Sequence, residues 1–390
     1  MKIYSLISFI LFTSCSLFSK EIKTINIVHW NIKELDNQKL KDPSKIRNIK
    51  SVLSNLEYNI LSVNELQYDL DGVPNYKYKT IGKNAETLAK ELGSDVGSMA
   101  ISFTQANTGQ NAKKEKGNYL TKNTIHARKL ADPINYGLFP GQFSTALLSY
   151  YPIKEEIVIK DLKWNEFNKD INYNKYKDNN RKPFKRNPEL FDKSFTDNII
   201  EVEGKEVHII SLHAVPSYHF GNKWSANYDR NRDQLRFLEW YITGGTDLSV
   251  KLPKRFKHIK PLKKNSRYII MGDFNVSIYS DNPGSKILKR IFQTTKMWLQ
   301  SPSHTHEIQR FEDKRNPLLL DYIGYKGLTL IDSGIYYPKE NDGSCLSFSE
   351  LPKQLKPRSN FTKKDCYNED LVELKLASDH FPIWAKLKLD

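Results

Sequence analysis

The sequence predicts an α/β or α+β fold. Short apolar segments bounded by polar clusters, as strands usually are, recur along the chain, and segments with helical periodicity lie between some of them. The strand-like segments are 25–30, 60–63, 146–150, 206–212, 268–271, 328–331 and 381–387. The helical segments are 43–56, with Ile46, Ile49, Val52, Leu53 and Leu56 on one face, and 232–242, with Leu235, Leu238 and 240–242 apolar.

We expect one folded domain over residues 21–390, because no repeat, low-complexity linker or convincing boundary divides the chain. Three polar segments are predicted to be surface insertions. Those near 104–123 and 164–193 are rich in Asn, Lys and Gly or Pro and show little periodicity, and the one near 251–264 is strongly basic.

Residues 1–20 have the organisation of an export signal, in which Lys2 precedes the apolar segment 3–12 and small residues lead to Cys15. Residues 12–15 are similar to a bacterial lipoprotein cleavage motif, whose cysteine becomes lipid-anchored; an ordinary signal peptide is the alternative. No later segment approaches the roughly 20 consecutive apolar residues of a spanning helix. We therefore expect an exported monomer that is secreted, periplasmic or lipid-anchored at the bacterial envelope.

Cys345 and Cys366 are the two cysteines besides Cys15. An even pair in a protein that leaves the reducing cytosol favours a disulfide. The sequence therefore predicts a bridge between them.

The chain is strongly basic, with 60 Lys and Arg residues, 45 Asp and Glu residues and a formal net charge of +15 at pH 7. Such a surface favours anionic partners. Nucleic acid, phospholipid headgroups and small phosphate esters all qualify, and a solvated lysine-rich surface without a ligand is the alternative.

Polar side chains follow several of the predicted strands. Asp273 and Asn275 come directly after 268–271, and Glu65 ends the segment 59–65. Functional groups collect at such strand ends, although Gly, Asp and Asn are also common in ordinary turns. Mg²⁺ takes oxygen ligands, usually with one or two carboxylates, so Glu65 is a candidate metal ligand, and a solvent-facing acid at a strand end is the alternative.

Two histidines occupy similar positions. His213 closes the strand 206–212, and Asp379 and His380 precede the terminal strand. A histidine beside a carboxylate can act as a general base near neutral pH. Taken singly, a histidine in such a position is more often structural than catalytic.

The order of these residues resembles that of the endonuclease/exonuclease/phosphatase superfamily, to which deoxyribonuclease I, exonuclease III and neutral sphingomyelinases belong. The resemblance spans roughly residues 25–389, and 139–143, 148–153 and 229–237 resemble a secreted bacterial branch. The matching residues are Asn31, Glu65, His213, Asp273, Asn275, Asp379, His380 and Asp321 of the Leu-Asp-Tyr-Ile element at 320–323. Asn64 and Tyr150 depart from the family pattern, which usually has Gln and Arg there.

The resemblance implies a deoxyribonuclease I-like fold, a four-layer sandwich of two mixed β-sheets flanked by helices. It also implies a divalent cation, Mg²⁺ with Mn²⁺ or Ca²⁺ as alternatives, held by Glu65 with Asn31 and Asp379. The segments 104–123 and 251–264 are then expected to rim the site.

The implied roles make His380, held by Asp321, the base for the attacking water, while Asp273 orients the nucleophile. His213 and Asn275 would donate to the phosphoryl oxygens, and Asp379 would assist the metal or position His380. An alternative assigns the activation of water to Asp273.

The implied activity is phosphoester hydrolysis, with a phosphodiesterase or nuclease as the first expectation because the basic surface suits a polyanion. A sphingomyelinase-like lipid headgroup phosphodiesterase or a small-ester phosphatase is the second. A non-catalytic surface binding protein is the third.

Overall fold

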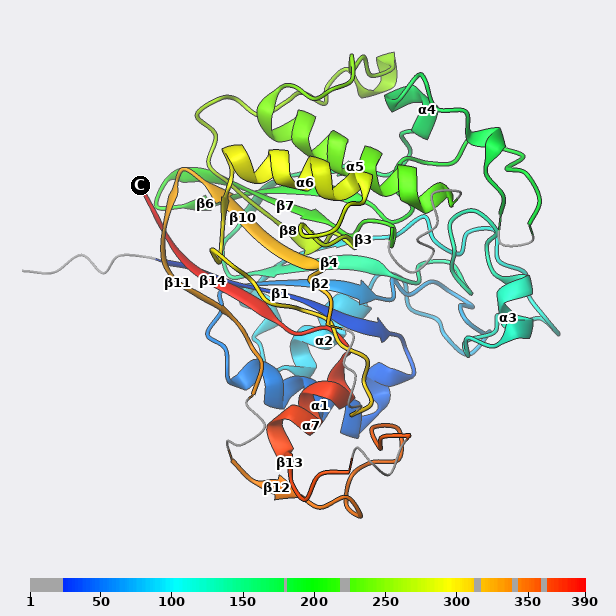
Figure 1. Cartoon of the computed structure of the whole chain (residues 1–390), viewed down its shortest axis with the longest axis vertical. Helices are drawn as coiled ribbons and strands as arrows, with labels where there is room; N and C mark the ends of the chain where they lie inside the picture. The colour runs from blue at the N-terminus through cyan, green and yellow to red at the C-terminus, as the bar shows by residue number, and fades with distance from the viewer. Residues whose placement is uncertain (1–23, 179–180, 218–224, 312–316, 339–342, 359–362) are drawn as a thin grey trace, which may run out of the picture.

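Two six-stranded β-sheets pack face to face in this computed structural model, which describes residues 24–178, 181–217, 225–311, 317–338, 343–358 and 363–390 (Figure 1). The predicted export signal and Cys15 lie outside the described residues, so export and lipidation remain predictions.

The first sheet has the strand order β11-β14-β1-β2-β4-β3. β1 and β2 are parallel, and the other neighbouring strands are antiparallel. The strands are β1 (Thr24–Leu35), β2 (Ile60–Leu66), β3 (Ala100–Thr104), β4 (Ser144–Ser149), β11 (Leu328–Ile335) and β14 (Ile383–Leu389).

The second sheet has the order β5-β6-β7-β8-β10-β9, with β7 and β8 parallel and the rest antiparallel. Its strands are β5 (Ile153–Ile159), β6 (Phe195–Val202), β7 (Lys205–Leu212), β8 (Tyr268–Asp273), β9 (Lys296–Met297) and β10 (Asp321–Lys326). A short hairpin of β12 (Cys345–Leu346) and β13 (Tyr367–Asn368) lies apart from both sheets.

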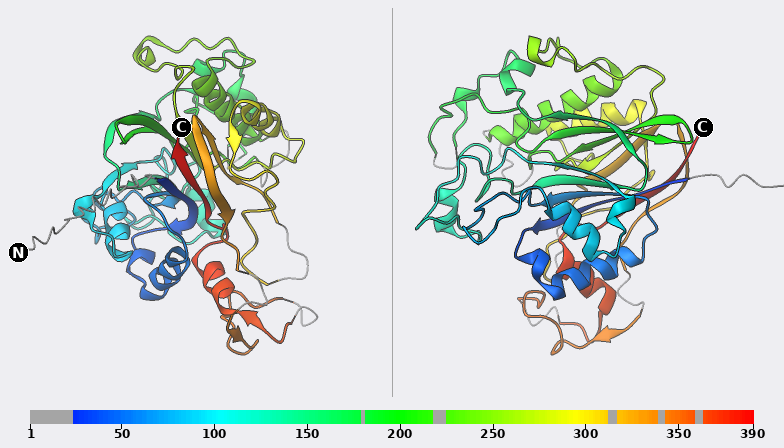
Figure 2. Two further views of the ribbon diagram at one scale, coloured as in Figure 1. Left: turned by 90° about the vertical axis from the view of Figure 1, so that its left-hand side faces the viewer. Right: turned by 180° about the vertical axis from the view of Figure 1, so that it is seen from behind.

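Helices cover the outer faces of both sheets and complete four layers (Figures 1 and 2). The first sheet is covered by α1 (Pro43–Ser54), α2 (Asn84–Glu91) and α7 (Glu369–Ala377), and the second by α5 (Ala226–Thr243) and α6 (Pro283–Thr294). Short helices α3 (Ile125–Leu130) and α4 (Trp164–Phe167), and 3₁₀ turns at Lys39–Lys41, Val96–Ser98, Tyr173–Lys175 and Lys254–Phe256, lie in the connections. The predicted fold class, a sandwich of two mixed sheets flanked by helices, is confirmed. No helix within the described ranges is long and apolar enough to cross a membrane.

Strand β1 shows how the sequence positions the site. Its side chains alternate between the two faces of the sheet, so Ile25 and Ile27 join the core between the sheets while Val28 and Trp30 pack in the core beneath the α1, α2 and α7 layer. By the same alternation, Asn31 points toward the second sheet. The strand therefore places the polar Asn31 side chain between the two sheets, on the same face as Ile25 and Ile27 earlier in the strand.

The segment 164–193 differs from the predicted surface insertion. Trp164, Phe167, Tyr176, Phe184 and Phe191 are buried in the core beside α5. Their spacing follows neither the helical nor the strand period, because an irregular chain carries them, and sequence periodicity therefore missed the burial. The segment therefore packs against the core through these aromatic side chains, and it is not the surface loop that was predicted.

The predicted bridge between Cys345 and Cys366 is confirmed, with a Cα–Cα distance of 5.1 Å and a sequence separation of 21. It ties β12 to the residue before β13.

Replacing both cysteines by serine is expected to lower the free energy of unfolding by about 3 kcal/mol, because a closed loop of this length restricts the unfolded chain. Denaturant unfolding of the oxidised protein, the reduced protein and the double variant measures this. Unfolding midpoints that coincide for all three would contradict the prediction.

Candidate active site

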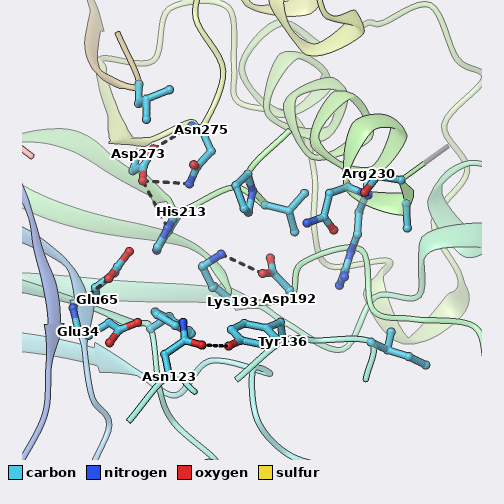
Figure 3. A pocket seen from close by; sticks show the side chains of 18 of the residues that line it. Glu34, Glu65, Asn123, Tyr136, Asp192, Lys193, His213, Arg230, Asp273 and Asn275 are labelled. Atoms are coloured by element: carbon cyan, nitrogen blue, oxygen red, sulfur yellow. Dashed lines mark hydrogen bonds and ion pairs between the residues drawn. The ribbon is translucent and has the colours of Figure 1, made fainter. Parts of the chain in front are cut away.

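A pocket of about 450 Å³ opens where the ends of β1, β2, β7 and β8 converge between the sheets (Figure 3). Of the eight residues predicted from sequence, six line it: Glu65, His213, Asp273, Asn275, Asp379 and His380. The other two, Asn31 and Asp321, hydrogen bond to residues of that lining. The structure thus brings all eight together.

Glu65 and Asp273 form the acidic centre of the pocket. The Asn31 Nδ2 atom donates to Glu65 Oε1 at 3.0 Å and to Asp273 Oδ2 at 3.1 Å, so two carboxylates from different sheets meet at one amide nitrogen. Asn31 Oδ1 accepts the backbone N–H of Lys33 at 3.1 Å. Asn31 was predicted to assist the metal directly; here its nitrogen faces the carboxylates and its oxygen is engaged elsewhere.

Unusual backbone geometry marks this centre. Glu65 and Asn275 have φ angles of +65° and +53°, which residues other than glycine rarely adopt. Such strain tends to collect at functional sites, where the surrounding structure holds it in place. Gly272 is required by close packing, because a Cβ there would lie 1.7 Å from the Leu212 carbonyl oxygen.

Asn275 and Asn64 hold Asp273 in place. Asn275 donates to the Asp273 carboxylate through its backbone N–H at 2.9 Å and through Nδ2 at 2.9 Å. The Asn64 Oδ1 atom accepts the backbone N–H of Asp273 at 3.0 Å. The departure at Asn64 from the family pattern therefore provides a positioning contact, whereas Tyr150 is exposed and lies outside the pocket lining.

His380 and Asp321 form a buried dyad. The His380 Nδ1 atom lies 2.8 Å from Asp321 Oδ2, and Thr305 Oγ1 donates to the same oxygen at 2.7 Å. Burial alone would lower the pKa of His380, but the Asp321 and Asp273 carboxylates outweigh it and raise that pKa. The pKa of Asp321 lies below its usual value because the charge of His380 and hydrogen bonds from His29 and His380 overcome the opposing effect of burial.

His213 has a different electrostatic environment. Its Nε2 atom lies 3.5 Å from Asp273 Oδ2, and its side chain is only 2% exposed. Burial, followed by the charge of Lys193, holds the pKa of His213 well below its usual value. Two histidines therefore flank Asp273 with opposite tendencies: His213 favours the neutral form, and His380, whose Nε2 lies 3.9 Å from Asp273 Oδ2, favours the charged form.

Asp379 is already paired with a cation. Its Oδ2 atom accepts Lys33 Nζ at 2.7 Å, and His306 Nε2 lies 3.9 Å away. Burial would raise the pKa of Asp379, but Lys33, His380 and His306 outweigh it and lower that pKa to about 2. A metal-ligand role for Asp379, predicted from the resemblance, would compete with Lys33.

Sequence reasoning missed several residues of this pocket. Glu34 lies beside Glu65, whose Oε2 accepts the Glu34 backbone N–H at 2.9 Å, and burial together with the charge of Glu65 raises the pKa of Glu34 to about 7. His306 stacks edge-on against His380, with ring centroids 4.8 Å apart. Glu34 lies at the end of β1, which runs to Leu35 and so extends beyond the predicted strand 25–30, and no predicted strand ends beside His306.

The residues at the acidic centre fit a divalent cation. Glu65 makes no ion pair with any residue that the structure describes, while its charge contributes to raising the pKa of both Glu34 and Asp273. A cluster of carboxylates that repel one another in this way would be relieved by a hard cation with oxygen ligands. Glu65 and Asp273, which share Asn31 Nδ2, could hold such a cation. Two further groups have ligand atoms close enough to hold one: Asp273 with Asp321 and His380, and His306 with Asp379 and His380.

The predicted rim is only half correct. Asn123, at the end of 104–123, lines the pocket, but no residue of 251–264 does. That basic segment instead packs against the segment around α4, where Arg255 Nη1 donates to Glu166 Oε1 at 2.8 Å. The prediction that 251–264 rims the site is therefore wrong for this pocket.

Comparison with solved structures supports the fold. The searches of protein-family models and of curated proteins found no match. Among solved structures, an endonuclease/exonuclease/phosphatase from Beutenbergia cavernae DSM 12333 is similar with a TM-score of 0.52 and 13% identity, covering 94% of this chain and 72% of that one.

Two further structures align with lower scores. An endonuclease/exonuclease/phosphatase family protein from Leptotrichia buccalis C-1013-b has a TM-score of 0.48 and 13% identity, covering 94% of this chain and 100% of that chain. Beta toxin from Staphylococcus aureus has a TM-score of 0.46 and 15% identity, with coverage of 94% and 100%. The chain therefore has the fold of the endonuclease/exonuclease/phosphatase structures, in agreement with the deoxyribonuclease I-like sandwich implied by its sequence.

Proposed function

We propose that this protein is a divalent-metal-dependent phosphoester hydrolase that acts outside the cytoplasm. The observation that carries the proposal is the meeting of the Glu65 and Asp273 carboxylates at one point, beside the Asp321–His380 dyad, in a pocket. The predicted export signal and the disulfide support the location.

A phosphoester resists hydrolysis because its anionic oxygens repel the nucleophile. A cation held by Glu65 and Asp273, Mg²⁺ first and Mn²⁺ or Ca²⁺ as alternatives, would neutralise that charge. His213, beside Asp273, would donate to phosphoryl oxygens as their charge develops. The same role predicted for Asn275 would require Asn275 to release a hydrogen bond, because its Nδ2 already donates to Asp273 Oδ2 and to the Ala214 carbonyl.

The attacking water is oriented between His380 and Asp273. Asp321 fixes the ring of His380 through Nδ1, so Nε2 is left to exchange a proton with the pocket. Asp273 is the alternative proton acceptor, and in that role its carboxylate would leave the cation to Glu65. His380, whose Nε2 lies 3.9 Å from Asp273 Oδ2, favours the charged form and would have to lose a proton before it could act as the base.

The dimensions of the pocket favour a compact substrate group. A cavity of about 450 Å³ lies in the range typical of small-molecule sites. A nucleotide at the end of a nucleic acid chain, a lipid headgroup or a small phosphate ester would fit such a space. Within the class, phosphodiester cleavage with a nucleotide or nucleic acid substrate remains the first candidate because of the basic surface.

Purified protein with Mg²⁺ or Mn²⁺ is expected to release product from at least one of plasmid DNA, RNA, sphingomyelin vesicles and a small chromogenic phosphodiester. The His380→Ala variant, purified identically, controls for contaminating hydrolases. Binding of a substrate without release of product from any of the four would refute the enzymatic proposal and favour a non-catalytic binding protein.

A further inference from the structure

The wall of the pocket formed by α5 contains a buried arginine that the proposed reaction does not use. The Arg230 side chain lines the pocket although the residue is only 1% exposed. Buried guanidinium groups are nearly always paired with a carboxylate. Arg230 makes no ion pair with any residue in the described part of the chain, and burial lowers the pKa of its guanidinium.

Three hydrogen bonds fix the guanidinium in place. Nε donates to the Leu190 carbonyl at 3.1 Å, and Nη2 donates to Asn135 Oδ1 at 2.9 Å and to the Glu189 carbonyl at 2.6 Å. All three acceptors are neutral. Nη1 has no hydrogen-bond partner among the residues that the structure describes, so one edge of a rigidly held cation remains available to the pocket.

Glu189 and Asp192, two of the carboxylates whose charges raise the pKa of Arg230, are engaged by other cations. Glu189 accepts hydrogen bonds from Lys163 and from Arg186 Nη1, the latter at 3.0 and 2.9 Å. Asp192 Oδ2 accepts Lys193 Nζ at 2.9 Å. The positive charge of Arg230 is therefore not neutralised by a contact of its own, and leaving a charge buried without a close partner is unfavourable.

The pocket has two chemically distinct ends. In Figure 3 the acidic residues Glu34 and Glu65 lie on one side, Arg230 lies on the other, and the Lys193–Asp192 pair lies between them. Between the ends the lining includes Tyr136, whose hydroxyl donates to Asn123 Oδ1 at 3.2 Å. A ligand that fills the pocket would place one group at the acidic end and another at Arg230.

We propose that Arg230 forms a second anion subsite, and that the substrate is a compact phosphoester carrying a second phosphate group. This inference rests on the proposed function only for the identity of the ligand as substrate. The fixed Nη1 edge binds an oxygen of the second phosphate, because guanidinium groups pair well with phosphate oxygens. The scissile phosphate lies at the Glu65 and Asp273 end.

Anion binding is tested first without catalysis. Sulfate added to metal-free wild-type protein is expected to raise the melting temperature in a saturable way, since a ligand of the folded state stabilises it. The Arg230→Gln variant is expected to lose that response. Arg255→Gln is the matched control, because Arg255 is exposed, is paired with Glu166 and lies outside the pocket lining.

The second test compares two substrates that differ only in the second phosphate. Thymidine 5′-(p-nitrophenyl phosphate) and its 3′-phosphorylated form both release p-nitrophenol. With Mg²⁺, the doubly phosphorylated form is expected to have a KM lower by about tenfold to a hundredfold, the value of a charge-assisted hydrogen bond. Arg230→Gln should remove the difference, and Arg230→Lys should keep part of it.

The two tests separate failure of this inference from failure of the proposed function. A wild-type protein whose melting temperature is indifferent to sulfate refutes the subsite whether or not the protein is an enzyme. Equal KM values for the two thymidine substrates in the wild type refute it as well, and this comparison needs no variant to fold. Sulfate stabilisation without any hydrolysis would preserve the anion site and contradict the enzymatic proposal alone.

Discussion

Replacing His380 by alanine is expected to lower turnover by about 10²-fold or more, the usual contribution of a general acid or base. The imidazole is held by Asp321 Oδ2 at 2.8 Å, and its Nε2 faces Asp273 across 3.9 Å. Removing the ring leaves the water without this proton-transfer partner, and it leaves the Asp321 carboxylate buried without its charged neighbour.

The measurement is steady-state turnover at saturating Mg²⁺ on whichever phosphoester the wild type cleaves. His126→Ala is the matched control, because His126 is an exposed histidine paired with Glu115, and it lies outside the pocket lining. Circular dichroism verifies folding of both variants. Turnover at the wild-type level in His380→Ala would show that the dyad is structural.

Replacing Glu65 by glutamine is expected to raise the Mg²⁺ concentration that gives half-maximal activity by about tenfold or more. The change keeps the shape of the side chain and its hydrogen bond with Asn31, but it removes the charge of a carboxylate that has no ion-pair partner among the described residues. Even the loss of residues that only orient a metal ligand typically costs about tenfold to a hundredfold in metal affinity.

Glu203→Gln is the control for this substitution. Glu203 also has a positive φ angle, +51°, but it is exposed and lies outside the pocket lining. Mg²⁺ titrations of activity, together with calorimetric titration of the metal-free proteins, measure both variants. An unchanged Mg²⁺ dependence in Glu65→Gln would move the metal away from Glu65.

The sequence was sufficient to predict which residues come together where polar side chains follow strand ends. Glu65, His213 and Asp273 each lie at the end of an apolar strand, so the pattern that identified β2, β7 and β8 also placed their functional groups. Because these strands belong to two sheets that pack together, the residues converge at one edge. The assignments of Asn31 and Asp321 came only from the family resemblance, whereas the carboxylate of Glu65 already indicated a candidate metal ligand.

Buried polar residues explain why strand β6 was not predicted from the sequence. Strand β6 carries Thr196, Asp197 and Asn198, all buried, which breaks the apolar pattern expected of a core strand. Asp197 is accommodated because its Oδ2 accepts the Tyr241 hydroxyl and lies near His208 Nδ1, both at 2.7 Å. Tertiary partners of this kind cannot be read from local periodicity.

Buried polar residues on α5 also explain why Arg230 was not singled out from the sequence. Arg230, Asn231, Asp233 and Gln234 are polar but buried, and Asn231 and Gln234 share a helix face with Leu235 and Leu238, where an amphipathic pattern would place apolar side chains. Arg230, Asn231 and Gln234 donate to backbone carbonyls of the segment 164–193 and of the residues after β7 and β8, and Asp233 accepts the Trp164 indole N–H. A segment predicted to be a surface loop thus supplies the environment that makes Arg230 unusual.

The central claim is that the Glu65–Asp273 centre hydrolyses a phosphoester with the help of a divalent cation. The most direct test is one assay of wild-type protein in three states: as purified with Mg²⁺, after chelation and dialysis, and after return of Mg²⁺. The account predicts product release in the first state, loss of product release in the second and recovery in the third. Product release that continues undiminished in the chelated protein, with elemental analysis finding no metal, would contradict it.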